Sequence, residues 1–89
     1  MDFEWDRDKA ARNVMRHRIT FEEAVTAFGD PLSVTISDPR HSDGEHRFIL
    51  FGLSERGRLL AISHVDRDGT TRIISARLAT RHERKQYES

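Results

Sequence analysis

The stretch HRFILFGLSERGRLLAISHVDRDGTTRIISAR, residues 46–77, carries the strongest structural signal in this chain of 89 residues. It divides into three runs rich in β-branched and other apolar residues, at 46–53, 58–65 and 70–77. The connections SERG and DRDG are short and end in glycine, which is typical of β-hairpin loops. The stretch therefore predicts three antiparallel strands that follow one another as a meander.

Before the meander, the chain begins with a pattern of a short strand followed by a helix. Phe3 and Trp5 alternate with acidic residues, as in a strand with one apolar face. Asp6 can cap a helix that runs to about His17, with small and apolar residues on one side of it. His17 is expected to complement the dipole at the end of this helix.

A second helix and a further strand are predicted next. Thr20 and Glu23 have the spacing of a capping box and open a helix that runs through Phe28. The sequence Gly-Asp-Pro at 29–31 stops this helix, because glycine and proline both end helical structure. Residues 32–36, LSVTI, predict a strand, and 37–45 predict a polar loop.

After the meander, Thr80 and Glu83 repeat the capping-box spacing and predict a short helix on the surface. The elements then follow the order β-α-α-β-β-β-β-α. This order predicts an α+β fold in a single domain, residues 1–89. We expect an antiparallel meander sheet with the two N-terminal helices on one face, and the other face left free for binding.

Composition narrows the class of protein. The chain has no cysteine, which excludes disulfides, thiolate metal sites and a cysteine nucleophile. The first residues are acidic where a signal peptide is basic, and no apolar run approaches the ~18 residues of a membrane span. We therefore expect a cytoplasmic protein that does not enter a membrane.

The net charge of zero hides an uneven distribution along the chain. Residues 1–45 hold six Lys and Arg against ten Asp and Glu, and residues 46–89 hold nine against five. The second half could meet phosphate groups, but the same polarity would also suit an acidic protein partner. Charge alone therefore leaves RNA and protein open as targets.

The common nucleotide, esterase and zinc-protease motifs are absent from the sequence. One cluster contains several metal-ligand residue types in a short loop: His41, Asp43, Glu45 and His46. Its spacing matches no defined metal site, so we interpret it as a solvated loop and expect neither a metal nor a cofactor.

Alternation along the last strand places two sets of residues on opposite faces: Ile73, Ser75 and Arg77 on one, and Arg72, Ile74 and Ala76 on the other. Arg72 and Arg77 therefore share a face only if a bulge interrupts the strand.

A cleft is expected where the last strand meets the C-terminal helix. Glu83 and Tyr87 are four residues apart and share one side of that helix. Arg77 lies at the end of the strand, where it can meet both of them. His64, near the end of the neighbouring strand, could reach the same place, depending on the register.

Several segments together resemble the BrnT family of proteins. They are FEWD at 3–6, residues 9–17, FEEA at 21–24, EHR at 45–47, Gly52, RIISARLAT at 72–80, Glu83 with Arg84, and Tyr87. The resemblance covers nearly the whole chain. One departure is Arg18, where relatives usually have a glycine that would suit a left-handed helix end.

The resemblance implies a RelE-like ribonuclease toxin of a type II toxin-antitoxin system. Such a toxin cuts RNA and so inhibits translation. It is held silent by a BrnA-type antitoxin, whose ribbon-helix-helix portion binds operator DNA. RNA, the antitoxin and, through the antitoxin, DNA are thus the expected partners.

The mechanism that the resemblance implies is metal-independent RNA cleavage, in which the 2′-hydroxyl attacks the adjacent phosphorus. Arg77 would stabilise the charge that develops on the phosphorane, because guanidinium binds phosphate oxygens without a metal. Further phosphate contacts are expected from Arg47, Arg72, Arg81 and Arg84. His64 and Glu83 are candidates for acid and base, Glu83 only if its environment raises its pKa. Tyr87 would stack on a base or position phosphate.

Plainer interpretations stand beside these. Arg77 could be a strand-end arginine paired with Glu83, and Glu83 could act only as the third residue of a capping box. The chain as a whole could be a catalytically inert module that acts with an antitoxin in operator repression. It could also be a nucleic-acid binder that leaves RNA intact.

Overall fold

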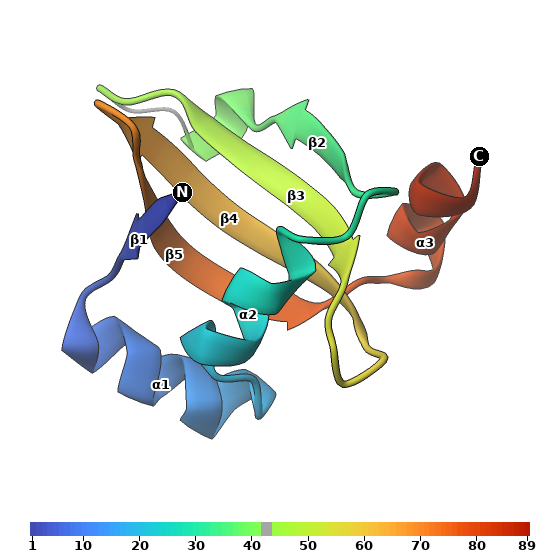
Figure 1. Ribbon diagram of the computed structural model, residues 1–89, viewed down its shortest axis with the longest axis horizontal. Helices are drawn as coiled ribbons and strands as arrows, with labels where there is room; N and C mark the ends of the chain where they lie inside the picture. Colours follow the sequence, from blue (N-terminus) through green and yellow to red (C-terminus); the bar gives the residue numbers. More distant parts are fainter. Residues whose placement is uncertain (42–43) are drawn as a thin grey trace.

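The computed structural model describes residues 1–41 and 44–89, which form one mixed sheet with three helices (Figure 1). No helix in these two ranges is long and apolar enough to cross a membrane. The elements are β1 (Asp2–Glu4), α1 (Arg7–His17), α2 (Phe21–Ala27), β2 (Val34–Ser37), the 3₁₀ turn η1 (Pro39–His41), β3 (Arg47–Leu53), β4 (Leu59–Arg67), β5 (Thr70–Leu78) and α3 (Arg81–Glu88).

The five strands lie in the order β1-β5-β4-β3-β2. Strands β2 to β5 pair antiparallel with their sequence neighbours, so the predicted meander is confirmed. The expectation of a purely antiparallel sheet is wrong at one edge, because β1 pairs parallel with β5 through Phe3 and Thr71. The physical reason is topological: β1 and β5 are joined through the rest of the fold and need no tight hairpin, so nothing local enforces an antiparallel pair.

Side-chain caps define where the helices begin. The Asp6 carboxylate accepts a hydrogen bond from the Lys9 amide at 3.0 Å, and the Thr20 hydroxyl accepts one from Glu23 at the same distance. At α3, the backbone and side-chain bonds between Thr80 and Glu83 complete a reciprocal capping box. The predicted helix starts are therefore confirmed.

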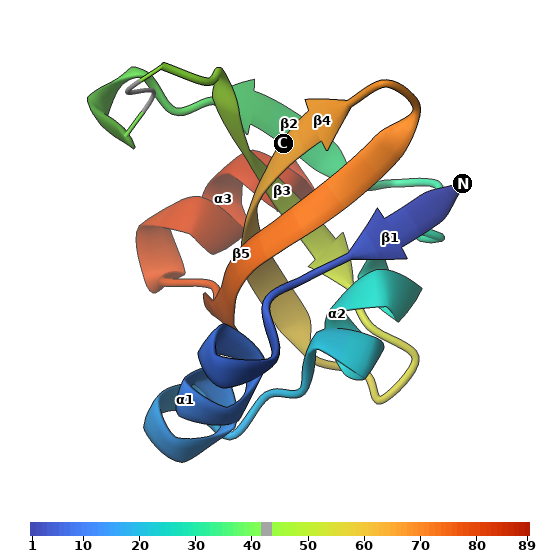
Figure 2. The ribbon, with the colours of Figure 1, turned by 90° about the vertical axis from the view of Figure 1, so that its left-hand side faces the viewer.

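The apolar core lies between the N-terminal helices and one face of the sheet (Figures 1 and 2). Phe21 and Ala24 of α2 pack with Leu60 and Ile62 of β4, and all four are fully buried. A β-carbon at Gly52 of β3 would lie 2.7 Å from the carbonyl oxygen of Ala27, so glycine is needed for this close approach.

A β-bulge in β5 changes which residues share a face. Ser75 pairs with Ser63 and Ile73 pairs with His64, so Ile74 is the extra residue. Thr71, Ile73 and Ala76 are consequently buried against the helices. The strict alternation expected for this strand is thus wrong, and Arg72, Ser75 and Arg77 all lie on the opposite face, which we call the outer face.

The outer face is not left free, because α3 folds back over part of it. In Figure 2, α3 lies on the other side of the sheet from α2. The helix contacts β3, and its Tyr87 hydroxyl donates to Asp30 in the turn after α2. Phe51 and Leu59, which share the outer face, are buried. The expectation that this whole face is free for binding is therefore wrong for the part that α3 covers.

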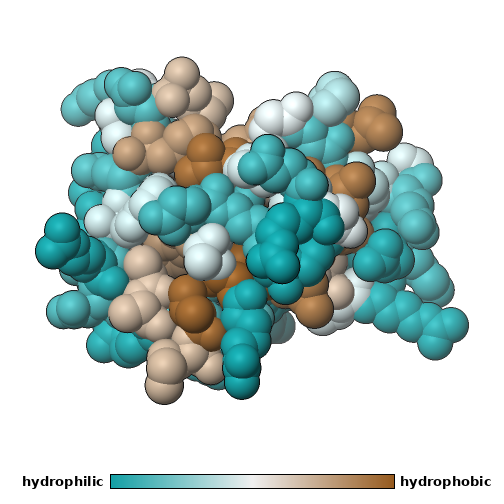
Figure 3. All heavy atoms as spheres, turned by 60° about the horizontal axis from the view of Figure 1, so that its bottom comes forward, coloured by the Kyte–Doolittle hydropathy of each residue, from teal (hydrophilic) through white to brown (hydrophobic). Residues whose placement is uncertain are grey.

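On the side of the molecule that carries α1 and α2, hydrophilic side chains dominate the surface (Figure 3). Apolar residues appear there only as small patches between them. Val14 and Met15 of α1 are the exposed large apolar residues of these two helices. Such small patches do not resemble a large protein interface.

Candidate functional site

A shallow pocket of about 240 Å³ opens on the outer face of the sheet. Cross-strand neighbours on β3, β4 and β5 form its floor, because Ile49 pairs with Ser63 and Ser63 pairs with Ser75. The lining residues are Asp38, Arg47, Ile49, Ser63, Ser75 and Arg77. We call this hollow the arginine pocket. Two arginines and two hydroxyl groups offer donors to an anion such as phosphate, and the carboxylate of Asp38 offsets part of their positive charge.

Arg77 is held by α3 at the rim of the arginine pocket. Its Nη1 donates to Glu83 Oε1 at 2.7 Å, and its Nη2 donates to Glu83 Oε2 at 2.9 Å. Nη1 also donates to the carbonyl of Leu78 at 3.3 Å. Guanidinium has five N–H donors, so Nε–H and one Nη2–H have no partner among the described residues. These two donors form a second fork edge that can bind two phosphate oxygens.

Glu83 is strongly acidic in this setting. The hydrogen bonds from Arg77 lower its pKa to about 2, against the opposing effect of partial burial. Its Oε1 also accepts from the Thr80 amide at 2.9 Å. Glu83 was expected to act as a general base only if its environment raised its pKa. The pKa is lowered instead, so this condition is not met. The geometry instead makes Glu83 a positioning residue for Arg77.

Arg47 and Arg72 lie on the same face in a row across four strands. The register aligns Glu4, Arg72, Val65 and Arg47 side by side. Arg47 lines the arginine pocket, whereas Arg72 does not and lies 3.8 Å from the Glu4 carboxylate. The structure therefore brings Arg47 and Arg77 together, with Arg72 further along the same face.

His64 lies on the opposite face of the sheet from Arg77. Its imidazole packs against Phe28 of the α2 end and Phe48 of β3, with ring centroids 5.0 and 5.8 Å away. Burial lowers the pKa of His64, against the hydrogen bond with the Ile62 carbonyl, which raises it. The expectation that His64 reaches the same cleft as Arg77 is wrong, because Arg77 pairs with Ala61, and His64, three residues further along β4, points to the opposite face.

Tyr87 shares a side of α3 with Glu83, as its spacing predicts, but its hydroxyl is bound elsewhere. It donates to Asp30 Oδ2 at 2.6 Å, and the same oxygen accepts from the Leu53 amide at 2.8 Å. Tyr87 does not line the arginine pocket. The convergence of all three residues on one cleft is therefore wrong for Tyr87, whose contact fixes α3 to the turn after α2.

Arg81 and Arg84 are exposed on α3 and line none of the pockets described for this chain. Only Glu83 and Tyr87 of this helix are partly buried, so the two arginines are turned toward solvent. Their predicted phosphate contacts stay predictions.

The loop cluster considered as a metal site falls partly outside the described residues, which leave out Asp43 and the side chain of His41. Within the described part of the chain, no group of three or more metal-ligand side chains is found. Glu45 is engaged by Arg67 through two hydrogen bonds, and His46 meets the hydroxyl of Ser37 at 3.0 Å.

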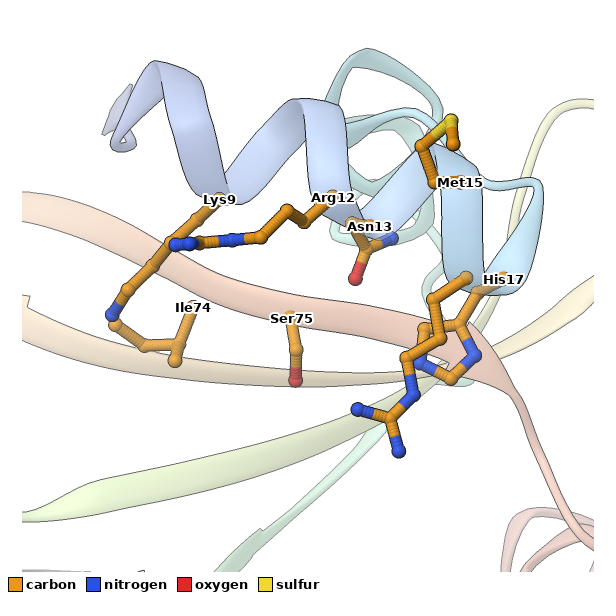
Figure 4. Close-up of a pocket in the computed structure, with 8 residues that line it drawn as sticks. Lys9, Arg12, Asn13, Met15, His17, Ile74 and Ser75 are labelled. Carbon is orange, nitrogen blue, oxygen red and sulfur yellow. The ribbon is translucent and has the colours of Figure 1, made fainter.

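A groove between α1 and β5 is a feature that the sequence interpretation missed (Figure 4). With a volume of about 520 Å³, it is lined by Lys9, Arg12, Asn13, Met15, Arg16, His17, Ile74 and Ser75. We call it the α1 groove. The signal that could have revealed it is the spacing of Lys9, Arg12 and Arg16, which places three cations on one side of a helix. This signal was missed because the three cations lie within residues 1–45, where acidic residues outnumber basic ones.

Comparison with known proteins identifies one family and one fold. Residues 5–83 match the family described as the ribonuclease toxin, BrnT, of type II toxin-antitoxin systems. The crystal structure of the Brucella abortus ribonuclease toxin BrnT superposes with a TM-score of 0.62 at 21% sequence identity. The match covers 91% of this chain and 99% of that one, and it shows a shared fold. No curated protein sequence matches the chain significantly.

Proposed function

We propose that this chain, which belongs to the BrnT family of type II toxin-antitoxin ribonuclease toxins, cuts RNA at the arginine pocket without a metal ion. The observation that carries the proposal is that Arg77, which keeps two N–H donors without a partner among the described residues, lines one pocket together with Arg47. Membership of a ribonuclease toxin family supports RNA cleavage as the activity, and the two arginines of the pocket support this location for it.

In the proposed reaction, the 2′-hydroxyl oxygen of a ribose attacks the adjacent phosphorus. Its proton leaves to a base, the P–O5′ bond breaks, and the 5′-oxygen takes up a proton. The products are a 2′,3′-cyclic phosphate and a 5′-hydroxyl. Charge builds up on the two non-bridging oxygens, where the Nε and Nη2 donors of Arg77 would hold it. Removing a preorganised donor of this kind costs roughly 3–4 kcal/mol in the barrier.

Proton transfer needs a different group from those the sequence suggested. Glu83 is a weak base at a pKa of about 2, and His64 is on the far face. His17 lines the α1 groove, which meets the arginine pocket at Ser75. We propose that His17 carries a proton to or from the reacting ribose, because an imidazole can do so near neutral pH.

Membership of a type II family implies an antitoxin partner. We propose that this partner is of the BrnA type, with a ribbon-helix-helix portion that carries the complex to operator DNA. We further infer that the fold is of the RelE type and that the toxin acts in the cytoplasm, where messenger RNA is translated.

The test is incubation of the purified chain with RNA in EDTA. We expect cleavage with cyclic phosphate ends, and we expect Arg77→Ala to reduce the rate at least a hundredfold while it stays folded and binds its antitoxin. Arg40→Gln, an exposed arginine of η1, is the control for loss of charge. An Arg77→Ala variant as active as the parent would remove Arg77 from the mechanism.

A second candidate function is an inert module that acts only with its antitoxin. The pairing of Arg77 with Glu83 favours it, because that carboxylate neutralises the arginine and is a poor base. Intact RNA in the same assay, with the antitoxin complex still bound to operator DNA, would establish this second function instead.

A further inference from the structure

We infer that the substrate is held as an extended single RNA strand that leaves the arginine pocket across Ser75 and follows the α1 groove. This inference rests on the proposed function and adds the path of the strand beyond the cleaved bond. The inference depends on Lys9, Arg12 and Arg16. None of these residues lines the arginine pocket, where the proposed reaction takes place.

The three cations stand on one side of α1, next to β5. At 3.6 residues per turn, positions 9, 12 and 16 fall close together around the helix, whereas Arg7 falls on the opposite side. Figure 4 shows the side chains of Lys9 and Arg12 reaching from the helix toward the strand that carries Ile74 and Ser75. The groove is therefore walled by positive charge along its length.

Four arginines of the strands and their loops are paired with acidic side chains, unlike the three cations of α1. Arg58, Arg67, Arg72 and Arg77 each lie within 4.0 Å of a glutamate carboxylate. No ion pair is found for the side chains of Lys9, Arg12 or Arg16 among residues 1–41 and 44–89. Three uncompensated cations on one side of a groove attract an external anion.

The wall of the groove is rigid because Asn13 fixes α1 to the edge of β5. Its Nδ2 donates to the Ala76 carbonyl at 2.8 Å, and its Oδ1 accepts from the Ala76 amide at 3.0 Å. Asn13 thus bonds to β5 as a neighbouring strand would, in the part of the strand that β1 does not reach. A preorganised groove loses less entropy when it binds an extended ligand.

Ser75 joins the groove to the arginine pocket, since it lines both hollows. It can do so because the bulge at Ile74 turns Ser75 to the outer face beside Arg77. A strand with one phosphate at Arg77 would therefore pass Ser75 and continue directly between the cations of α1.

Nucleic acid fits the groove better than an apolar protein segment. The span from position 9 to position 16 is about 10 Å at 1.5 Å per residue, which suits two or three phosphates of one strand. Met15 and Ile74 are the apolar residues of the lining, and the other six lining residues are polar or charged.

The test uses a 12-nucleotide oligoribonucleotide with 2′-O-methyl groups, which lacks the attacking hydroxyl and remains intact. Its binding is measured by fluorescence anisotropy over a range of salt concentrations. We expect the variant Lys9→Gln, Arg12→Gln, Arg16→Gln to bind about 10- to 100-fold more weakly. The slope of log K against log salt should fall by about 2, because each single-strand phosphate contact contributes about 0.7.

The matched control carries the same loss of charge elsewhere, as Arg7→Gln, Arg40→Gln, Arg56→Gln. These three residues are exposed and lie outside both hollows. We expect the control to keep the parent slope within about 0.5. Circular dichroism confirms that both variants are folded.

Cleavage of substrates of different length separates this inference from the proposed function. A dinucleotide has only one phosphate, which Arg77 would hold in the proposed reaction, so no further phosphate is left for Lys9, Arg12 and Arg16. The α1 variant should therefore cut it as fast as the parent, while kcat/KM for a 12-nucleotide RNA falls at least tenfold. Equal losses of kcat/KM for both substrates, or an unchanged slope of log K against log salt, would overturn the proposed path of the strand. Neither result would contradict cleavage at the arginine pocket.

An α1 variant that binds RNA normally but no longer binds its antitoxin would assign the groove to the protein partner. A parent chain that neither binds nor cuts RNA would overturn both.

Discussion

Arg77 and Glu83 are joined by two hydrogen bonds, from Nη1 to Oε1 at 2.7 Å and from Nη2 to Oε2 at 2.9 Å. The pair connects the end of β5 to the first turn of α3. It keeps the arginine side chain in one orientation at the rim of the arginine pocket, with its Nε edge available. Order of this kind is what a residue needs in order to stabilise developing charge without reorganisation.

Removing the Glu83 charge should change how stability depends on pH. The folded pKa is lowered from 4.5 to about 2, so the stabilisation is fully present above about pH 4.5 and is lost as the pH falls toward 2. Because Arg77 is partly exposed, we expect Glu83→Gln to cost about 1–2 kcal/mol at pH 7. Urea unfolding between pH 2 and 7 checks this, with exposed Glu22→Gln as control. A difference that persists unchanged at pH 2 would contradict the assignment.

Asn13→Ala should destabilise the fold by about 2–4 kcal/mol. The side chain makes three buried hydrogen bonds, one to the Ile19 carbonyl at 2.9 Å and two with the backbone of Ala76. Alanine leaves those backbone groups buried without partners. The measurement is urea unfolding beside Arg12→Ala, an exposed neighbour that we expect to cost less than about 0.5 kcal/mol. Equal costs for the two variants would show that Asn13 does not anchor α1.

His64 should make the protein less stable as the pH falls below about 6.5. Burial lowers its folded pKa, so the unfolded chain binds a proton more readily than the folded one in this range. His64→Gln should remove this loss of stability, whereas exposed His82→Gln should retain it. Thermal unfolding between pH 5 and 8 measures the effect. RNA cleavage by His64→Gln should also stay near the parent rate, and a large drop would show that His64 takes part in the reaction after all.

Arg18→Gly should stabilise the protein by about 0.5 kcal/mol. Arg18 ends α1 in the left-handed conformation, with φ 60° and ψ 32°, while its amide donates to the Val14 carbonyl. Relief of about 1–2 kcal/mol of backbone strain exceeds the roughly 0.5–1 kcal/mol that glycine costs through the unfolded chain. The reverse effect is expected for Arg18→Val, since a branched side chain fits this conformation poorly. Chemical denaturation of the two variants gives the comparison, and a destabilised Arg18→Gly would contradict the strain.

Local signals in the sequence were sufficient to predict most of the secondary structure. Alternating apolar residues and glycine-ended loops predicted the meander, and the spacings of Thr20 with Glu23 and Thr80 with Glu83 predicted two helix starts. Each of these depends on residues within a few positions of one another. The resemblance to the BrnT family, carried by short segments along the chain, was likewise confirmed.

The candidate site was predicted only in part. The pairing of Arg77 with Glu83 follows from their positions at a strand end and in a helix start. The lowered pKa of Glu83 does not follow from the sequence, because the size of the shift depends on the distance between the two groups and on their burial. His64 and Tyr87 were assigned to the cleft from chain position alone, and long-range contacts with Phe28 and Asp30 place them elsewhere.

The sequence by itself thus determined the elements, their caps and the family, because these depend on short-range patterns. Only the tertiary structure decided that Ile74 bulges, that Arg47 and Arg77 share a pocket, and that α1 places three cations beside it. The extra residue in β5 moves each side chain that follows it to the face opposite the one that strict alternation predicts. Whether a strand takes that extra residue is settled by packing against the helices and by the Asn13 contacts, which join parts of the chain 63 residues apart.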